Sequence, residues 1–176
     1  MRDVHSFFEA AAASDVGRVR KDNEDSFLVR TDRGLWAVAD GMGGHSGGKL
    51  ASSIVVESLA RMPAPRNVGD LVSGCAALLG EANDRIYTQA QANGGTIGTT
   101  VAILAAQEGR FACIWSGDSR VYLVRDGRIR QISRDHTEAQ ELVAQGVLTA
   151  EEARRWPRRN VITRAIGVGD DPELEL

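Results

Sequence analysis

Apolar and polar residues alternate with a period of two in several short stretches of the chain, and apolar residues recur at helical spacing in longer ones. Turn-forming residues separate the stretches that are typical of strands, which cover residues 5–13, 26–31, 34–39, 96–106, 110–116, 119–124 and 128–133. Asp126-Gly127, between the last two, is typical of a type I′ hairpin turn. We therefore expect residues 96–133 to form a four-stranded antiparallel meander.

The stretches that are typical of helices cover residues 49–61, 68–91 and 136–156. Asn67 is a suitable N-cap for the second of them. Thr149 is expected to cap the second half of the third, ahead of Glu151 and Glu152. Strands, then two helices, then antiparallel strands indicate an α+β fold rather than alternating α/β. We expect an antiparallel β-sandwich with the helices packed on its outside.

Length, charge and cysteine content narrow the class of protein. The chain has 176 residues and a net charge of −3, so we expect one domain over 1–176 and no general binding of nucleic acid. Apolar runs such as 101–106 are too short to span a bilayer, and no signal-peptide core is present. Cys75 and Cys113 form neither a disulfide framework nor a zinc motif, which favours a reducing, cytoplasmic setting.

Two carboxylates stand at the ends of predicted strands. Asp40 is followed at once by residues 41–48, which contain five glycines, and Asp118 lies in the turn 117–120 between two apolar strands. A rigidly held carboxylate at the rim of a sheet, beside an unobstructed Gly41 carbonyl, suits hard cations such as Mg²⁺ or Mn²⁺. Taken singly, each aspartate is explained equally well as a turn-forming residue.

Residues 18–25 form a charged run that cannot belong to the core. Its mixed signs are typical of a solvated loop. The functional alternative is an anion site beside a metal site, in which an arginine such as Arg20 binds phosphate and Glu24 or Asp25 holds metal-bound water.

The segment 43–49 matches the phosphate-binding pattern GxxxxGK, after a predicted strand and before a predicted helix. Leu50 stands where a P-loop needs the hydroxyl of Ser or Thr. Further alternating strand–helix units are also missing. The sequence therefore disfavours a P-loop nucleotide binder.

Five segments resemble, in order and spacing, the motifs of the PP2C-type (PPM) metal-dependent protein serine/threonine phosphatases, bacterial members above all: 14–25, 38–45, 98–100, 117–120 and 135–137. The resemblance covers nearly the whole chain. It implies an antiparallel β-sandwich flanked by helices in an α-β-β-α arrangement. It also implies hydrolysis of phosphoserine and phosphothreonine on proteins, the substrates of a serine/threonine kinase, by water held between two Mg²⁺ or Mn²⁺ ions.

The resemblance also implies roles for single residues. Asp40 would bridge both metals, and Gly41 would add its carbonyl. Glu24 and Asp25 would act through metal-bound waters, and Arg20 would bind the substrate phosphate.

A third, weaker metal site is implied for bacterial members. Asp118 would hold that ion, and Asn160 would add a backbone carbonyl. Residues 135–160 would form a flap beside the active site.

The sequence departs from the family at two places. Met42 occupies the position of a proposed histidine general acid of larger members, so the proton donor is unassigned. The Ser-Asp-Gly and Asp-Asn segments that complete the metal centre in the family are not found in this sequence.

From the second departure we expect a domain without its last strands and helix. We expect weak metal binding, low or absent activity of these 176 residues alone, and self-association through an exposed sheet edge. The alternative is a pseudophosphatase-like module that binds phosphoproteins through Arg20.

Overall fold

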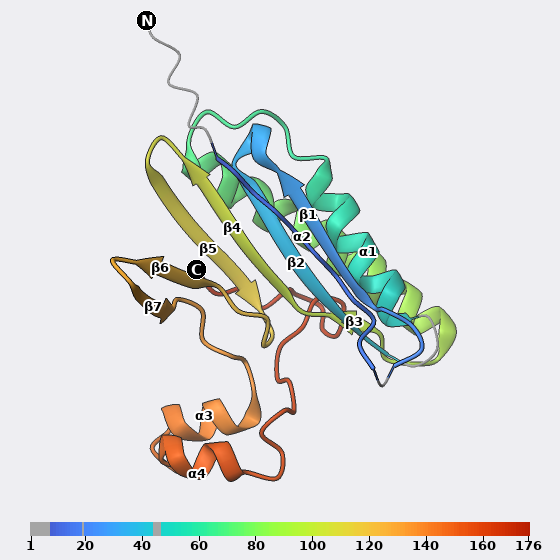
Figure 1. The fold of residues 1–176 in the computed structure, drawn as a ribbon. Helices are drawn as coiled ribbons and strands as arrows, with labels where there is room; N and C mark the ends of the chain where they lie inside the picture. The colour runs from blue at the N-terminus through green and yellow to red at the C-terminus, as the bar shows by residue number, and fades with distance from the viewer. Residues whose placement is uncertain (1–7, 19, 44–46) are drawn as a thin grey trace, which may run out of the picture.

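The computed structural model describes residues 8–18, 20–43 and 47–176 (Figure 1). Its elements, in chain order, are β1 (Asp25–Arg30), η1 (Thr31–Arg33), β2 (Leu35–Met42), α1 (Gly47–Ala60), α2 (Val68–Asn93), β3 (Gly98–Thr99), β4 (Val101–Gln107), β5 (Arg110–Ser116), β6 (Tyr122–Arg125), β7 (Arg128–Gln131), α3 (Glu138–Ala144) and α4 (Ala150–Arg155). The α+β fold class is thus confirmed.

The central element is an antiparallel sheet in the order β1-β2-β4-β5, with β3 paired to the end of β2. Helices α1 and α2 pack together on one face of this sheet (Figure 1). Side chains alternate between the faces: Leu35, Ala37 and Ala39 of β2 are buried towards the helices, whereas Val38 and Asp40 are exposed on the opposite face. We call these the covered face and the open face.

The predicted helices correspond well to the observed ones. Asn67 caps α2 by accepting a hydrogen bond from the Asp70 amide at 2.9 Å. The third predicted helix is divided into α3 and α4, because Gly146 has a φ of +72° and turns the chain between them. Thr149 and Glu152 form the capping box that starts α4.

The expected strand over 5–13 is wrong for its described part, since residues 8–13 have no regular secondary structure, and residues 5–7 lie outside the described residues. The apolar pattern there has another cause. The Phe8 ring packs edge-on against Trp36, with ring centroids 5.0 Å apart, and Ala11 and Ala12 line a groove on the open face.

The expected meander is also wrong at one connection. Strands β4 and β5 pair, and β6 and β7 pair through a turn in which Asp126 and Gly127 both have positive φ, as a type I′ turn requires. However, β6–β7 forms a separate two-stranded sheet. The chain leaves β5 at Gly117, whose φ of +104° redirects it, so β6 does not pair with β5.

Candidate active site

Two carboxylates face each other at one end of the central sheet. Asp25 and Asp40 are the first residue pair of the β1–β2 ladder and lie directly opposite in register. Opposed residues of an antiparallel pair project from the same face, with Cβ atoms about 4.5–5.5 Å apart, and like charges there destabilise the sheet. Such a pair is unfavourable for folding alone, which points to a cation.

Charged groups from three segments of the chain lie close enough to interact at Asp40. Although Asp40 is an exposed residue overall, partial burial of its carboxyl group raises the pKa, and the nearby carboxylates of Asp25 and Asp118 raise it further, whereas Arg20 opposes the shift. The structure therefore brings together four of the residues singled out from the sequence: Arg20 and Asp25 before and at the start of β1, Asp40 in β2 and Asp118 after β5.

Thr100 links the Asp40 strand to the Asp118 turn. Its amide donates to the Asp40 carbonyl at 2.9 Å, and its Oγ1 accepts from the Asp40 amide at 3.1 Å. The same Oγ1 lies 2.7 Å from Ser119 Oγ. Thr100 belongs to the matched segment 98–100, but sequence reasoning gave it no role of its own; the signal for it was its place in that segment, between β3 and β4.

Gly41 is required where β2 meets the start of α1. A Cβ on this residue would lie 2.0 Å from the Gly48 carbonyl oxygen and 2.8 Å from the Glu24 carbonyl oxygen. The Gly41 amide donates to the Glu24 carbonyl at 3.3 Å, and Ser52 Oγ donates to the same oxygen at 2.6 Å. The backbone of Glu24 is thereby held beside the Asp25–Asp40 pair.

Arg20 lies at the exposed side of this cluster. Its side chain is 65% exposed, and its Nη1 is 4.0 Å from Glu24 Oε2, which is the outer limit of an ion pair. An exposed, loosely held pair contributes little to stability. The guanidinium is therefore able to turn to an incoming anion.

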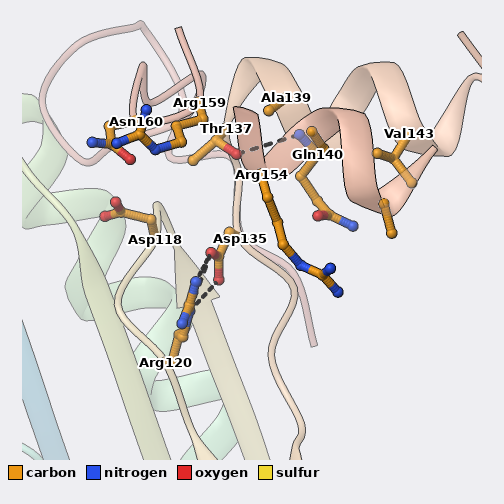
Figure 2. A pocket seen from close by; sticks show the side chains of 12 residues that line it. Asp118, Arg120, Asp135, Thr137, Ala139, Gln140, Val143, Arg154, Arg159 and Asn160 are labelled. Atoms are coloured by element: carbon orange, nitrogen blue, oxygen red, sulfur yellow. Dashed lines mark hydrogen bonds and ion pairs between the residues drawn. The ribbon is translucent and has the colours of Figure 1, made fainter. Parts of the chain in front are cut away.

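Asp118 and Asn160 line a pocket of about 520 Å³ between the end of β5 and helices α3 and α4 (Figure 2). In Figure 2 Asn160 lies above Asp118, with the Arg159 side chain beside it. Burial raises the pKa of the Asp118 carboxyl, and Asp135 raises it further. Asp135 itself accepts hydrogen bonds from Arg120, one at 2.8 Å.

The donor chemistry fits a hard cation, though incompletely. Carboxylate oxygens at the end of a sheet are typical ligands of Mg²⁺ and Mn²⁺. Within the described ranges, no cluster of three or more Asp, Glu, His or Cys side chains is close enough to hold a metal ion. The Asp25–Asp40 pair offers two carboxylates on one face of the sheet, fewer than such a cluster contains.

Other sequence candidates are placed elsewhere or given structural roles. Lys49 Nζ donates to the Asp25 carbonyl at 2.8 Å, and the strand before it belongs to an antiparallel sheet, so neither feature supports a P-loop. Cys75 and Cys113 are free and buried, and burial raises the pKa of the Cys75 thiol to about 12, as expected of a core residue.

The fold and the site together define a class of protein: an α+β domain in which two carboxylates lie opposite each other at one end of an antiparallel sheet. Residues 17–166 match the family model described as protein phosphatase 2C. The chain belongs to the protein phosphatase 2C family.

Named relatives agree with this assignment. The chain is 40% identical, over 94% of its length, to a Mycobacterium tuberculosis protein named serine/threonine protein phosphatase PstP, and spans 32% of that protein. A structure described as PppA, a key regulatory component of T6SS in Pseudomonas aeruginosa, superposes with a TM-score of 0.85 at 42% identity, covering 94% of this chain and 68% of that one.

A third comparison concerns metal. The catalytic domain of serine threonine protein phosphatase PstP in complex with two manganese ions superposes with a TM-score of 0.79 at 38% identity. The match covers 94% of this chain and 70% of that one. This chain thus spans about a third of the mycobacterial relative and about two thirds of the solved chains.

Proposed function

We propose that this chain contributes to a metal-dependent phosphatase that hydrolyses phosphoserine and phosphothreonine on proteins. The observation that carries the proposal is the direct opposition of Asp25 and Asp40 on the open face of the sheet, with Arg20 in the same electrostatic cluster. Family membership supports it, as does the manganese-containing relative.

Asp40 is proposed as the central metal ligand, with the Gly41 carbonyl beside it and with Glu24 and Asp25 acting on ordered water. The dense packing around Gly41 supports this, because it fixes the backbone of both strands at the site. Two Mg²⁺ or Mn²⁺ ions, when bound, would supply an activated water and neutralise charge that develops on the phosphoryl group.

Arg20 is proposed to bind the substrate phosphate. Its fork of N–H groups matches phosphate oxygens bidentately. Its ion pair with Glu24, at 4.0 Å, is weak enough to leave the guanidinium available for this. We propose Asp118 with Asn160 as a further, weaker cation site. One carboxylate and one neutral oxygen leave half of a divalent charge unbalanced, which is consistent with low affinity.

The experiment is titration of the chain with Mn²⁺, followed by water proton relaxation, together with phosphate release from a phosphothreonine peptide. We expect a dissociation constant on the order of 1 mM, because few carboxylates are assembled. Asp40→Asn should remove this binding. Asp32→Asn is the matched control, since Asp32 lies in η1 at the other end of β1.

Turnover is expected to be low, depend on Mn²⁺ and disappear in Asp40→Asn. Unchanged Mn²⁺ binding in that variant would remove Asp40 from the site. Binding of the phosphopeptide through Arg20 in the absence of any metal, without turnover at any Mn²⁺ concentration, would instead support the phosphoprotein-binding module.

We also propose that the chain acts in the cytoplasm and self-associates. Two buried free thiols are consistent with a reducing compartment. None of the helices in the described part of the chain is long and apolar enough to cross a membrane.

Self-association is supported by exposed sheet surface. β1 is an edge strand, and the apolar side chains of Phe27 and Val38 on the open face are 42% and 47% exposed.

Self-association is tested by sedimentation velocity across a range of protein concentration. We expect a concentration-dependent dimer that Val38→Lys weakens. A monomer at all concentrations would contradict this part of the proposal.

A further inference from the structure

A buried histidine lies behind the Asp118 turn and outside the metal and phosphate roles proposed above. The side chain of His136 is 3% exposed. Its ring stacks on Trp115, with ring centroids 6.2 Å apart and an interplanar angle of 25°. It begins the segment that leads into α3, whose N-cap is its neighbour Thr137, so helix capping does not explain His136.

Both nitrogens of the His136 ring have defined partners. The Gly117 amide donates to Nδ1 at 3.2 Å, and Nε2 lies 2.9 Å from Glu175 Oε2. Because Nδ1 accepts a hydrogen bond, the ring proton belongs on Nε2, which donates it to the Glu175 carboxylate. The surroundings therefore select one tautomer of a neutral ring.

The backbone completes the clamp on Gly117. The His136 amide donates to the Gly117 carbonyl at 2.9 Å, so His136 binds both polar backbone groups of that glycine. Gly117 has a φ of +104°, and a Cβ on it would lie 2.6 Å from Thr100 Cγ2. A turn in this sparsely populated conformation persists only where its surroundings hold it.

Asp118 follows Gly117 directly, and it needs such support. It lies close enough to Asp40 and Asp135 for their carboxylates to interact with it. Like charges favour movement of Asp118 away from them unless the backbone is fixed.

We infer that His136 is a positioning residue, which fixes the Gly117-Asp118 turn through Gly117 and Glu175 and so holds the Asp118 carboxylate beside the candidate centre. The cation role of Asp118 rests on the proposed function, whereas the fixing of the turn does not. Glu175 orients the ring from the other side and is anchored to β5 by backbone hydrogen bonds with Trp115 at 2.9 and 3.0 Å.

The first test is the tautomer, read from two-bond ¹⁵N–¹H correlations of His136 in the full 176-residue chain. The proposal expects the proton on Nε2. A proton on Nδ1 would overturn it, because Nδ1 could then not accept from Gly117.

The second test is amide hydrogen exchange at Gly117. His136→Phe removes the acceptor and should accelerate exchange about fivefold, the value of one hydrogen bond. His136→Asn places an oxygen near the Nδ1 position and should restore slow exchange. A general loss of packing would accelerate exchange in both variants, so equal rates in the two would overturn the proposal.

Glu175 variants keep the test valid if His136→Phe does not fold. Glu175→Ala should raise the Nδ1-protonated fraction and accelerate exchange at Gly117, whereas Glu175→Gln, which still accepts from Nε2, should not. Glu173→Ala is the matched control, because Glu173 also pairs with Arg164, whereas the ion pair with His136 is made by Glu175. Identical behaviour of Glu175→Ala and Glu173→Ala would overturn the inference.

The link to Asp118 is tested with Mn²⁺ alone, by water proton relaxation. Asp118→Asn should weaken the lower-affinity binding phase, and His136→Phe should weaken it about fivefold while His136→Asn does not. If Asp118→Asn weakens Mn²⁺ binding and His136→Phe does not, the positioning role is overturned. No effect of Asp118→Asn would overturn the cation role within the proposed function, and exchange at Gly117 would still decide whether His136 fixes the turn.

Discussion

The two faces of the central sheet carry different kinds of residues on the same strands. On the covered face, Leu35 and Ile103 are fully buried beneath α1 and α2. On the open face, Phe27 and Val38 are about half exposed although they are apolar, and the Asp25–Asp40 pair lies at the end of the same rows. The covered face forms a buried hydrophobic core, whereas the open face combines exposed apolar surface with two like-charged carboxylates that face each other.

Coverage of the open face is itself uneven. Near β5, Cys113 and Trp115 are buried and pack with Val121 and Ile132, which flank the β6–β7 hairpin. Near β1 and β2 the apolar side chains line a groove of about 250 Å³. Stability is therefore expected to come mainly from the covered face, whereas the residues of the proposed site lie on the open face.

The strongest test of this division compares neighbouring residues of β4. Ile103 is fully buried on the covered face, and Leu104 is partly buried on the open face. Ile103→Ala should lower the free energy of unfolding by about 3–4 kcal/mol, through lost burial and a new cavity. Leu104→Ala should cost about 1 kcal/mol. Urea unfolding measures both, and equal costs would show that the open face is as much a core as the covered one.

Two glycines allow the next comparison. Gly41→Ala places a methyl group against the Gly48 carbonyl oxygen and should cost about 3 kcal/mol, because backbone on both sides must move. At Gly80, inside α2, an added methyl group would meet open space, with no atom of the described residues outside its own helix turn within 4 Å. Gly80→Ala should therefore stabilise the protein by about 0.5–1 kcal/mol. Thermal unfolding of both variants gives the sign directly. A tolerated Gly41→Ala would contradict the close approach of β2 to α1.

Asp40 precedes Gly41 and lies on the open face. Its substitution should stabilise the protein, whereas that of Gly41 should destabilise it. Asp40→Asn relieves repulsion from Asp25 and should raise the free energy of unfolding by about 0.5 kcal/mol when no metal is present. Asp32→Asn is the control of opposite sign, because Asp32 accepts a hydrogen bond from Arg30 at 2.9 Å. Added Mn²⁺ should stabilise the unaltered chain and not Asp40→Asn. A destabilised Asp40→Asn would mean that Asp40 serves the fold.

Local patterns predicted most of the fold, because they depend on neighbours in sequence. The Asn67 cap, the Asp126-Gly127 turn and the α1 and α2 helices follow from such signals. The predicted strand was wrong over the described residues 8–13, because an apolar pattern cannot distinguish a paired backbone from a coil that packs its side chains on a sheet.

For the site, the resemblance singled out Arg20, Asp40 and Asp118, and the structure brings them together. It included Thr100 and His136 in matched segments without showing what they contact, and it did not single out Glu175. The partners of these residues are distant in sequence, and a short segment does not reveal a distant partner. Ladder register and turn geometry were needed to assign them.

The smallest predicted effect concerns the rim of the open face, where Glu175 meets His136. The hydrogen bond from His136 lowers the pKa of the Glu175 carboxyl, with help from Arg134 and Arg164. The carboxylate form therefore stabilises the fold fully above the ordinary value of 4.5, and this contribution is lost as the pH falls below it. For a side chain that is 31% exposed we expect about 0.5 kcal/mol. Glu175→Gln should thus be less stable than the unaltered chain at pH 6, and urea unfolding should show this difference shrinking by about pH 3.5. Parallel curves for Glu175→Gln and the unaltered chain would show that the rim contact contributes nothing to the fold.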